Sequence, residues 1–388
     1  MLNVVNVGQG DCFILRPRGE GCIHNKKTFI IDLGDGKNDI TKNLGNKDLS
    51  YHLILTHSHK DHIGGLKYFV GEDFDKITDL TLPLYHNEVV IIANSILKLE
   101  GISKLKESYG LIEYLNEIVS TQKVLQKITR LGKPNITFAY EGENLCNHIE
   151  VYNPPVKIVD SGKNFRNEKN VNRMLNLFDK RYRSQIEWYY IMSQNGNDNF
   201  TDSPSINDLI LSDYNHKNIN NSNYVFDFFM KNIDRIEMFN TKPTMRRLYS
   251  IIAEYELTSN QVSIVFKYNY GKSILFTGDA DKKVLKRIIE AGYDIQSDYL
   301  KVPHHGSKNN LNKFILNKIK PKKAIISHGN AKFGRAKDTH PNKEVIDMIN
   351  KEKIDLIVTN DIIKNNKTIF NRNFDNKEDK YVKVVGCD

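Results

Sequence analysis

The sequence predicts an α/β fold in which two β-sheets pack face to face with helices outside. Residues 1–85 and 258–388 carry this prediction. Each stretch contains short β-branched and apolar runs punctuated by Gly and Asp, and in the second stretch these runs alternate with amphipathic segments. At 388 residues, the chain is long enough for one large or two medium domains with a sizeable core.

The first stretch is predicted to consist mainly of strands. The candidate strands are "NVVNVGQGDCFILR", "KTFIIDLGDG", "YHLILT" and "ITDLTLPLYHNE", and "IGGLKYFV" is predicted to begin a helix. Residues 88–131 then repeat apolar positions at intervals of three and four, which is typical of helices. Strands return in "ITFAYEGENLCNHIEVYNPP".

The composition changes between residues 157 and 257, where helix-like stretches flank the polar loops "NGNDNFTDSPS" and "NHKNINNSN". We expect this segment to be an insertion that acts as a cap or binds a protein partner. Residues 1–156 are then one half of the sandwich, with a helical insertion at about 88–131, and residues 258–388 are the other half.

The last stretch alternates clearly between strands and helices. The candidate strands are "SIVFKY", "KSILFTGD", "DYLKVPHH", "KKAIISHG", "DLIVTND" and "YVKVVG", and the candidate helices are "DKKVLKRIIEAG", "LNKFILNKI" and "HPNKEVIDMINK". Gly292 is suited to end the first helix and Pro341 to open the last, because Gly is favoured after a helix and Pro in its first turn.

Composition narrows the class of protein. The formal net charge of +9 is compatible with a nucleic-acid or nucleotide partner but does not require one. Four scattered cysteines form no CxxC pair, which argues against a disulfide framework and a zinc–thiolate site and suits a reducing compartment. The chain has no secretory signal and no run of about 18 apolar residues, so we expect a cytoplasmic protein without a membrane span.

The stretch "LTHSHKDHIGGL" places three histidines and an aspartate within six residues. Imidazole nitrogen and carboxylate oxygen are ligands that divalent zinc or manganese accepts. At the end of a strand, His57 and His59 would point the same way and hold one ion, while Asp61 and His62 would hold a second. In two-metal hydrolases the ions lie roughly 3.5–4 Å apart, a span that this loop can bridge. The sequence therefore predicts two divalent ions, zinc or manganese.

Two ions need more ligands, and the ends of other strands offer them. Asp279 ends "SILFTGD", and its carboxylate could bridge both ions, although a Gly–Asp pair alone is more often an ordinary turn. His304 and His305 end "DYLKVPHH"; adjacent histidines usually point apart, so we expect one to bind metal and the other to line the pocket. Asp32 ends "KTFIID" and could brace a ligand histidine by accepting its other ring proton.

With these residues in hand, the chain resembles the metallo-β-lactamase superfamily, whose HxHxDH signature matches "THSHKDHIGG". The motifs "NVGQGDCFIL", "FIIDLGDG", "NQVSIVFKY", "ILFTGDA", "LKVPHHGSK" and "AIISHGN" look, in that order, like the hydrolase domain of ComEC-type competence (DNA-uptake) proteins. The resemblance covers about 1–85, 135–156 and 258–350. It implies an αββα metallo-β-lactamase sandwich with helical insertions and a dinuclear site at one edge of its sheets.

The resemblance also implies ligand roles. They are His57 and His59 at the first ion, Asp61 and His62 at the second, Asp279 as the bridge, and His304 completing the second ion. Many members of the superfamily take a third histidine for the first ion, for which His86 is the nearest candidate and His148 a weaker one. Competence proteins join this domain to a membrane channel, and since the chain has none, no transport role is implied.

The predicted activity is metal-assisted hydrolysis, with Asp61 at the catalytic centre. We expect a phosphodiesterase or nuclease acting on DNA, RNA or nucleotides. Lys308, Lys332 and Arg335 (with Lys337) could meet phosphates, and His305 or His340 (or His328) could protonate the leaving oxygen. The alternative is a hydrolase of a small-molecule ester, lactone, thioester or β-lactam, because the fold supports all of these by varying its loops.

Overall fold

The structure is a computed structural model of the chain. The residues that it describes are 1–17, 27–44, 50–71, 73–84, 131–155, 259–329, 332–333, 338–364, 367–370 and 381–386, with residues 86, 97, 116, 125 and 128. The chain divides into two compact units: unit 1 is Met1–Leu84, Arg130–Val156 and Ser259–Asp388, and unit 2 is Tyr85–Thr129 and Lys157–Thr258. The expected insertion at 157–257 lies outside the described residues, as does most of the expected helical segment 88–131.

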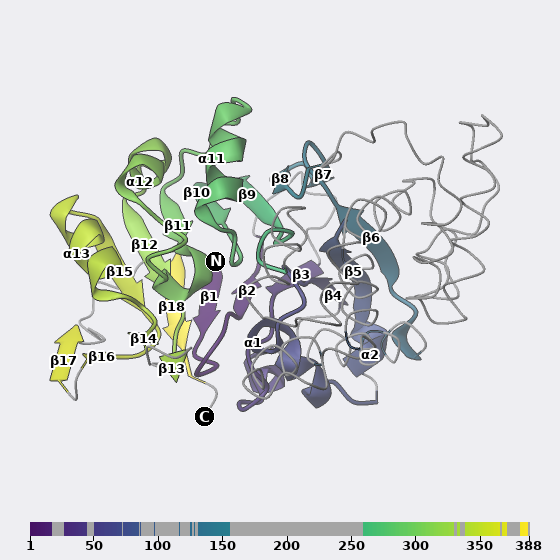
Figure 1. The fold of residues 1–388 in the computed structure, drawn as a ribbon. Helices are drawn as coiled ribbons and strands as arrows, with labels where there is room; N and C mark the ends of the chain where they lie inside the picture. Colours follow the sequence, from purple (N-terminus) through teal and green to yellow (C-terminus); the bar gives the residue numbers. More distant parts are fainter. Residues whose placement is uncertain are drawn as a thin grey trace, which may run out of the picture. The chain divides into compact units, whose positions relative to one another are not determined.

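Unit 1 contains two seven-stranded mixed sheets with flanking helices, which confirms the predicted fold (Figure 1). In spatial order, the first sheet is β18 (Val382–Val385), β1 (Leu2–Val5), β2 (Phe13–Leu15), β3 (Lys27–Ile31), β4 (Ser50–Ile54), β5 (Ile77–Pro83) and β6 (Asn135–Ala139). The second is β15 (Asp355–Val358), β12 (Lys323–Ile326), β11 (Tyr299–Lys301), β10 (Lys272–Phe276), β9 (Val265–Tyr270), β8 (Ile149–Asn153) and β7 (Asn144–Cys146). Two short ribbons accompany them: β13 (Lys332–Phe333) with β14 (Asp338–Thr339), and β16 (Ile362–Lys364) with β17 (Lys367–Phe370).

The described helices are short. The α-helices are α1 (Lys60–Ile63), α2 (Asp73–Lys76), α11 (Lys282–Glu290), α12 (Lys313–Ile319) and α13 (Lys343–Lys351). The 3-10 helices are η1 (Ile40–Asn43), η2 (Gly64–Tyr68) and η3 (Pro303–Gly306). Within the described ranges, no helix combines the length and the apolar character needed to cross a membrane.

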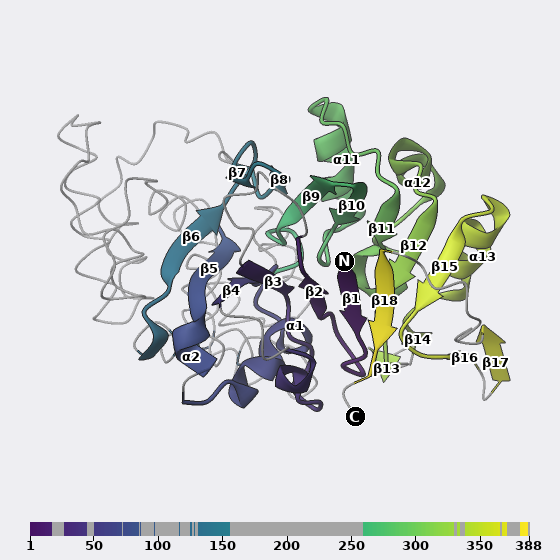
Figure 2. The ribbon, with the colours of Figure 1, turned by 180° about the vertical axis from the view of Figure 1, so that it is seen from behind.

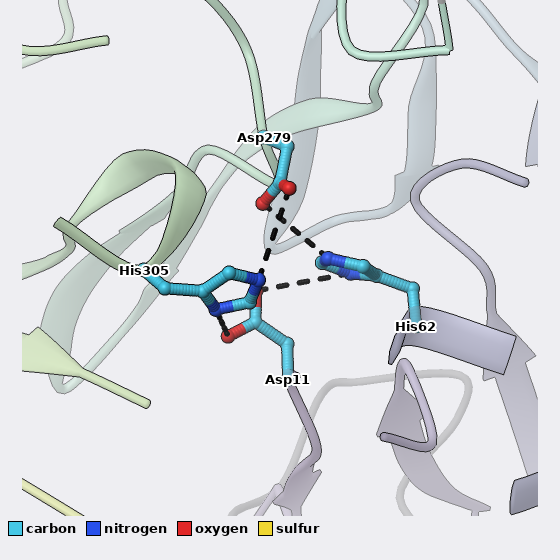
Figure 3. Close-up of side chains that lie close together, drawn as sticks. All are labelled: Asp11, His62, Asp279 and His305. Carbon is cyan, nitrogen blue, oxygen red and sulfur yellow. Dashed lines mark ion pairs between the residues drawn. The ribbon is translucent and has the colours of Figure 1, made fainter. Parts of the chain in front are cut away.

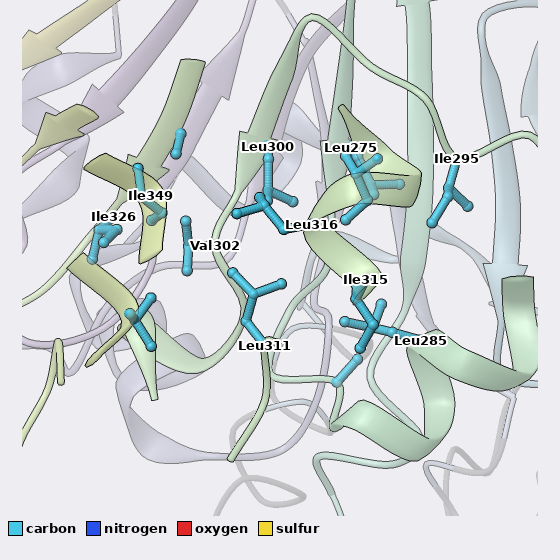
Figure 4. Close-up of a cluster of buried hydrophobic side chains, with 14 of the residues drawn as sticks. Leu275, Leu285, Ile295, Leu300, Val302, Leu311, Ile315, Leu316, Ile326 and Ile349 are labelled. Atoms are coloured by element: carbon cyan, nitrogen blue, oxygen red, sulfur yellow. The ribbon is translucent and has the colours of Figure 1, made fainter. Parts of the chain in front are cut away.

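Two apolar cores hold unit 1 together. Between the sheets, alternate residues of facing strands are buried against each other, and the rings of Phe13 and Phe276 meet edge to face with centroids 5.5 Å apart. The second core lies between the second sheet and helices α11, α12 and α13, where Leu285, Ile315 and Ile349 are buried (Figure 4). Each side chain of this size contributes about 1.5–3 kcal/mol when fully buried. These cores fix the strand ends that carry the site.

The two sheets do not follow the division of the chain into residues 1–156 and 258–388. The last strand, β18, pairs in parallel with β1 of the first sheet, with Leu2 opposite Val382 (Figure 2). Conversely, β8 lies in the second sheet, where Ile149 pairs with Tyr268 of β9. Each half of the chain therefore contributes strands to the other half's sheet. Apolar alternation specifies that a segment is a strand, but it does not specify which edge the strand joins.

The helix after β4 begins earlier than expected from "IGGLKYFV". His59 precedes the first turn of α1, so Asp61 and His62 are helical rather than part of a loop. The two glycines that follow permit close packing: a Cβ at Gly64 would lie 2.4 Å from the carbonyl carbon of Asp35, and a Cβ at Gly65 would lie 2.2 Å from a backbone oxygen. The Gly–Gly pair thus lets this turn pack directly on the segment that follows β3.

Candidate metal centre

Chemically active side chains from distant parts of the chain meet at one end of the strands of unit 1. Among the residues that the structure describes, two groups of side chains could hold a metal ion, and both share one carboxylate: Asp11, His62, Asp279 and His305 form one group, and His57, His59 and Asp279 form the other. Figure 3 shows the four members of the first group pointing toward one another, from the loop after β1, from α1, from the loop after β10 and from η3. In every group the ligand atoms lie within 4.8 Å of one another.

Asp279 lies at the centre of this arrangement. Its Oδ1 lies 3.4 Å from Nε2 of His62, and its Oδ2 lies 3.7 Å from Nε2 of His57. The same Oδ2 lies 3.6 Å from Nε2 of His304 and 3.8 Å from Nε2 of His305. The carboxylate predicted as the bridge therefore faces imidazoles from both parts of the chain.

Local structure explains the position of Asp279. Gly278 has a φ of +48°, and a Cβ there would lie 3.0 Å from Cβ of Ser263, so this turn favours glycine. Two residues later, Asp281 caps α11 by accepting hydrogen bonds from the backbone N–H groups of Lys283 and Val284. The turn between β10 and α11 is thus fixed at both ends. Its "TGDAD" sequence is more than the ordinary surface turn that a Gly–Asp pair would suggest.

The histidines share a hydrogen-bonding pattern that directs Nε2 toward Asp279. Nδ1 of His62 lies 2.7 Å from Oδ2 of Asp32, and Nδ1 of His305 lies 3.0 Å from the carbonyl oxygen of Ser327. Nδ1 of His304 lies 3.3 Å from Oδ1 of Asn310. An oxygen partner at Nδ1 places the ring proton there and leaves the Nε2 lone pair available for a metal.

Asp32 occupies the place that a bracing carboxylate requires. It is 1% exposed, and besides His62 it accepts hydrogen bonds from the backbone N–H of Thr56 at 2.8 Å and from the Thr56 hydroxyl at 2.7 Å. Its own backbone has a φ of +54°, a conformation that Asp tolerates better than most residues. The hydrogen bonds around Asp32 tie the end of β3 to the start of the histidine motif.

His304 and His305 do not point apart, contrary to the expectation for adjacent histidines. Both have left-handed backbones, with φ of 48° and 51°, so their side chains do not alternate as they would in a strand. Their rings are 5.9 Å apart, and both Nε2 atoms face Oδ2 of Asp279. His305 is fully buried and belongs to a candidate ligand group, whereas the side chain of His304 is 27% exposed. The predicted role of His304 as a ligand stays a prediction.

The spacing of these atoms fits a bound cation. Ligands about 2.0–2.2 Å from a tetrahedral ion lie roughly 3.3–3.6 Å from one another. The Nε2 atoms of these histidines lie 3.4–3.8 Å from the carboxylate oxygens of Asp279, which is longer than an ordinary hydrogen bond. Nε2 of His62, Nε2 of His305 and both carboxylate oxygens of Asp279 are buried without a hydrogen-bond partner. Buried polar atoms left in this way are expected to find a partner, and a divalent cation suits this donor set.

Burial and neighbouring charges set the protonation of the histidines. Burial lowers the pKa of His57, and it lowers the pKa of His59 to about 4, so both rings are neutral and able to bind metal at pH 7. Burial acts in the same direction on His305, but Asp279 and Asp11 outweigh it and raise the pKa of His305 to about 10. The carboxylates of Asp279 and Asp11 therefore favour a positive charge at His305.

Asp61 lies at the more accessible side of the cluster. Its Oδ2 is 3.2 Å from Nε2 of His305, and its side chain is 22% exposed. Burial acts to raise the pKa of Asp61, but the neighbouring imidazole of His305 and the charge of His62 hold it below its ordinary value. Asp61 is therefore a carboxylate at neutral pH. Neither of the two candidate ligand groups includes it.

The sequence did not single out two buried residues of this centre, Asp11 and Lys301. Asp11 is 0% exposed, with Oδ1 3.4 Å from Nδ1 of His305. Lys301 is 1% exposed, forms an ion pair with Asp11, and donates a hydrogen bond to the carbonyl oxygen of Gly278 at 2.6 Å. Two signals were available: an acidic residue between "GQG" and an apolar strand, and a lysine within the otherwise apolar "YLKV".

Other predicted site residues are placed as follows. His86 is buried, belongs to unit 2 and is in neither candidate ligand group. His148 lies in the turn between β7 and β8, with its ring 4.9 Å from that of Tyr270. The ring of His340 is 5.2 Å from that of His304, beside the cluster.

The predicted phosphate-binding residues receive less support. Lys308 has a side chain that is 48% exposed, and its Nζ lies 3.4 Å from Glu344. Lys332 belongs to β13, and Arg335 lies outside the described residues. His328 is fully buried, with Nε2 3.0 Å from the carbonyl oxygen of Asn360, so its ring is directed away from solvent.

Comparisons with known proteins agree with the fold and the motif. The family model of the metallo-beta-lactamase superfamily matches residues 5–77, which include β2 to β4 and the histidine motif. ComE operon protein 3 of Bacillus subtilis (strain 168) is 29% identical to this chain over 102 residues. The match spans 26% of this chain and 12% of the length of that relative. The matched sequence, the two-sheet sandwich and the buried His/Asp cluster make the chain similar to the metallo-β-lactamase superfamily, and the cluster is a candidate metal site of the kind that metal-dependent hydrolases use.

Proposed function

We propose that the protein is a metal-dependent phosphodiesterase that acts on nucleic acid or nucleotides. The observation that carries hydrolysis is the convergence of imidazole Nε2 atoms on the buried carboxylate of Asp279. The substrate class rests on the resemblance of the motif order to ComEC-type domains, on the similarity to ComE operon protein 3, and on the net charge of +9. A basic protein attracts polyanions in solution.

Two cations would use different histidines and share Asp279. His57 and His59 would hold the first, since Nε2 of His57 and Nδ1 of His59 lie 3.0 Å apart. His62 and His305 would hold the second through their Nε2 atoms, which face Asp279 from two elements. Zinc and manganese both accept these ligands. A bound divalent cation supplies Lewis acidity, which neutralises charge on a phosphate oxygen and lowers the pKa of water.

The chain's own residues supply the proton transfers. Asp61 is a partly exposed carboxylate at the edge of the cluster, so it can accept a proton from the attacking water. His304 is also partly exposed, and its ring contacts that of His340. A proton for the leaving oxygen would come from this pair, with His340 as the outer donor. The base and the acid would then act from two separate segments, α1 and the loops after β11 and β14.

The test is incubation of the purified protein with labelled single- and double-stranded DNA and RNA, with Mn²⁺ or Zn²⁺ added. We expect cleavage by the wild type and a loss of at least about 100-fold in Asp61→Ala, the range for removal of a general base. Asp75→Asn is the matched control, because Asp75 is an exposed carboxylate on α2. Equal cleavage by Asp61→Ala would refute the assignment. Hydrolysis of lactones, thioesters or β-lactams without cleavage of any nucleic acid or nucleotide would refute the substrate class and favour the alternative activity.

A further inference from the structure

Lys301 is a positive charge placed inside the candidate metal centre. It lies at the end of β11 and is 1% exposed. Its Nζ forms an ion pair with Oδ2 of Asp11, donates to the carbonyl oxygen of Gly278 at 2.6 Å, and lies 3.5 Å from Oδ1 of Asp279. All three ammonium donors thus have an oxygen acceptor nearby, two of them on carboxylates of the cluster.

A buried carboxylate is stable only when a charge or several hydrogen bonds compensate it. Asp11 and Asp279 are both 0% exposed and lie at the same cluster. A metal ion would compensate them, but it can dissociate. Lys301 is covalently part of the chain, so its charge is present in every copy of the folded protein, with or without metal.

The position of Asp11 indicates a supporting role rather than metal binding. Its Oδ1 lies 3.4 Å from Nδ1 of His305, and its Oδ2 lies 3.8 Å from Nδ1 of His62. Both distances involve Nδ1 and not the Nε2 atoms that face Asp279. The ammonium of Lys301 beside this carboxylate also repels a divalent cation that would approach it. Asp11 therefore lies behind two imidazoles, where its negative charge attracts the Nδ1–H group of each ring and helps to orient it.

We propose that Lys301 is a positioning residue, an internal cation that holds Asp11 and Asp279 in place when metal is absent and reserves Asp11 for orienting His62 and His305. This inference rests on the proposed binding of cations at the same centre. It predicts that a bound metal ion and the Lys301 ammonium each partly compensate the charge of the buried carboxylates when the other is absent. Removal of the lysine should weaken the metal-free protein and increase the stabilisation that added metal provides.

Thermal unfolding of Lys301→Met, with a chelator and then with excess Mn²⁺, measures both effects. Lys267→Met is the matched control, because Lys267 lies on β9 of the same sheet, has a side chain only 8% exposed, and pairs with Asp294 at 3.1 Å outside the cluster. Breaking a buried ion pair predicts a melting temperature about 10 °C lower for metal-free Lys301→Met. Mn²⁺ should raise the melting temperature of this variant by several degrees more than it raises that of the wild type or of Lys267→Met. Equal behaviour of Lys301→Met and wild type in chelator, or an equal gain from Mn²⁺, would overturn the inference.

Removal of both charges of the Lys301–Asp11 ion pair provides a second measurement. Asp11→Asn combined with Lys301→Met should melt at a higher temperature than Lys301→Met alone, because no carboxylate is left uncompensated beside the missing ammonium. If Lys301→Met does not fold even with Mn²⁺, folding of the double variant supports the inference, and its failure to fold overturns it.

Calorimetric titration with Mn²⁺ separates this inference from the proposed function. Loss of the neighbouring ammonium should tighten the binding of at least one cation about tenfold or more in Lys301→Met. A wild type that binds no cation would refute the proposed function, while the melting temperatures in chelator would still test the compensation of Asp11 by Lys301. A wild type that binds Mn²⁺ with the same affinity as Lys301→Met would refute the inference and leave the function intact.

Discussion

Asp32→Asn tests whether His62 binds metal through Nε2. Oδ2 of Asp32 accepts from the Thr56 hydroxyl at 2.7 Å and from Nδ1 of His62 at 2.7 Å, whereas Oδ1 accepts from the backbone N–H of Thr56 at 2.8 Å. In Asp32→Asn, the side-chain amide oxygen can still accept from the backbone N–H of Thr56, so its NH₂ group faces the Thr56 hydroxyl and Nδ1 of His62. The Thr56 hydroxyl can rotate to accept a hydrogen bond from this NH₂ group. Nδ1 of His62 can accept one only when the ring proton moves to Nε2, the atom that faces Asp279.

The expected loss follows from this change of tautomer. Replacing a partner that orients a metal-binding histidine weakens metal affinity about 10- to 100-fold, which corresponds to about 1.4–2.7 kcal/mol. One cation should lose more affinity than the other, because Asp32 contacts His62 directly and reaches His57 only through the Thr56 hydroxyl. The fold should lose no more than about 1 kcal/mol, since the variant keeps the size of the side chain and the bond to Thr56 N–H.

Calorimetric titration of Asp32→Asn with Mn²⁺ at pH 7 measures affinity and stoichiometry together. Asp298→Asn is the matched control, because Asp298 also accepts from a backbone N–H, that of Ser273 at 3.1 Å, and lies away from the cluster. Wild-type affinity in Asp32→Asn would show that His62 does not need its proton on Nδ1, and the assignment of its Nε2 as a ligand atom would fail. An equal loss at both cations would also contradict the separate roles of the two groups.

Three further predictions test the packing, the electrostatics and the cation. Gly10→Ala places a Cβ 1.9 Å from the backbone oxygen of Asp61, so urea unfolding should show that the free energy of unfolding falls by about 3 kcal/mol or more. Gly71 also has positive φ but faces open space, so Gly71→Ala should lower the free energy of unfolding by only about 1 kcal/mol. The hydrogen bond from Lys322 lowers the pKa of Asp298, so this carboxylate stabilises the fold above its unfolded pKa of about 3.9, and the contribution is lost as pH falls further. Melting curves between pH 7 and pH 3 should therefore show that acid lowers the melting temperature less in Asp298→Asn than in the wild type. Removal of metal with a chelator should abolish hydrolysis and added Mn²⁺ should restore it, and full activity in chelator would contradict metal dependence.

Much of the candidate site was predictable because its chemistry is local in sequence. His57, His59, Asp61 and His62 lie within six residues, and imidazoles and carboxylates at that spacing have few other uses. Asp279 was predictable with less certainty, because it required the assumption that its strand ends at the same edge as β4. The structure places Oδ2 of Asp279 3.7 Å from Nε2 of His57.

The supporting residues were harder to predict because their roles depend on three-dimensional neighbours. A buried lysine in an apolar strand is unusual, but nothing in the sequence pairs Lys301 with Asp11. The left-handed backbone at His304 and His305 was also not predictable, because neither residue is glycine, which is the residue that usually marks positive φ. Gly306, which follows them, also has positive φ, and a Cβ there would lie 2.5 Å from Cβ of Pro341.

The alternation of strands and helices, the two-sheet architecture and the histidine motif could all be predicted before the structure, because hydrophobic periodicity and ligand chemistry act over a few residues. Three features became known from the fold: β18 closes the first sheet beside β1, both His304 and His305 turn toward Asp279, and Lys301 and Asp11 share the cluster. These features depend on sheet pairing and side-chain burial between segments that are distant in the sequence, where the free energy comes from contacts that no local pattern encodes.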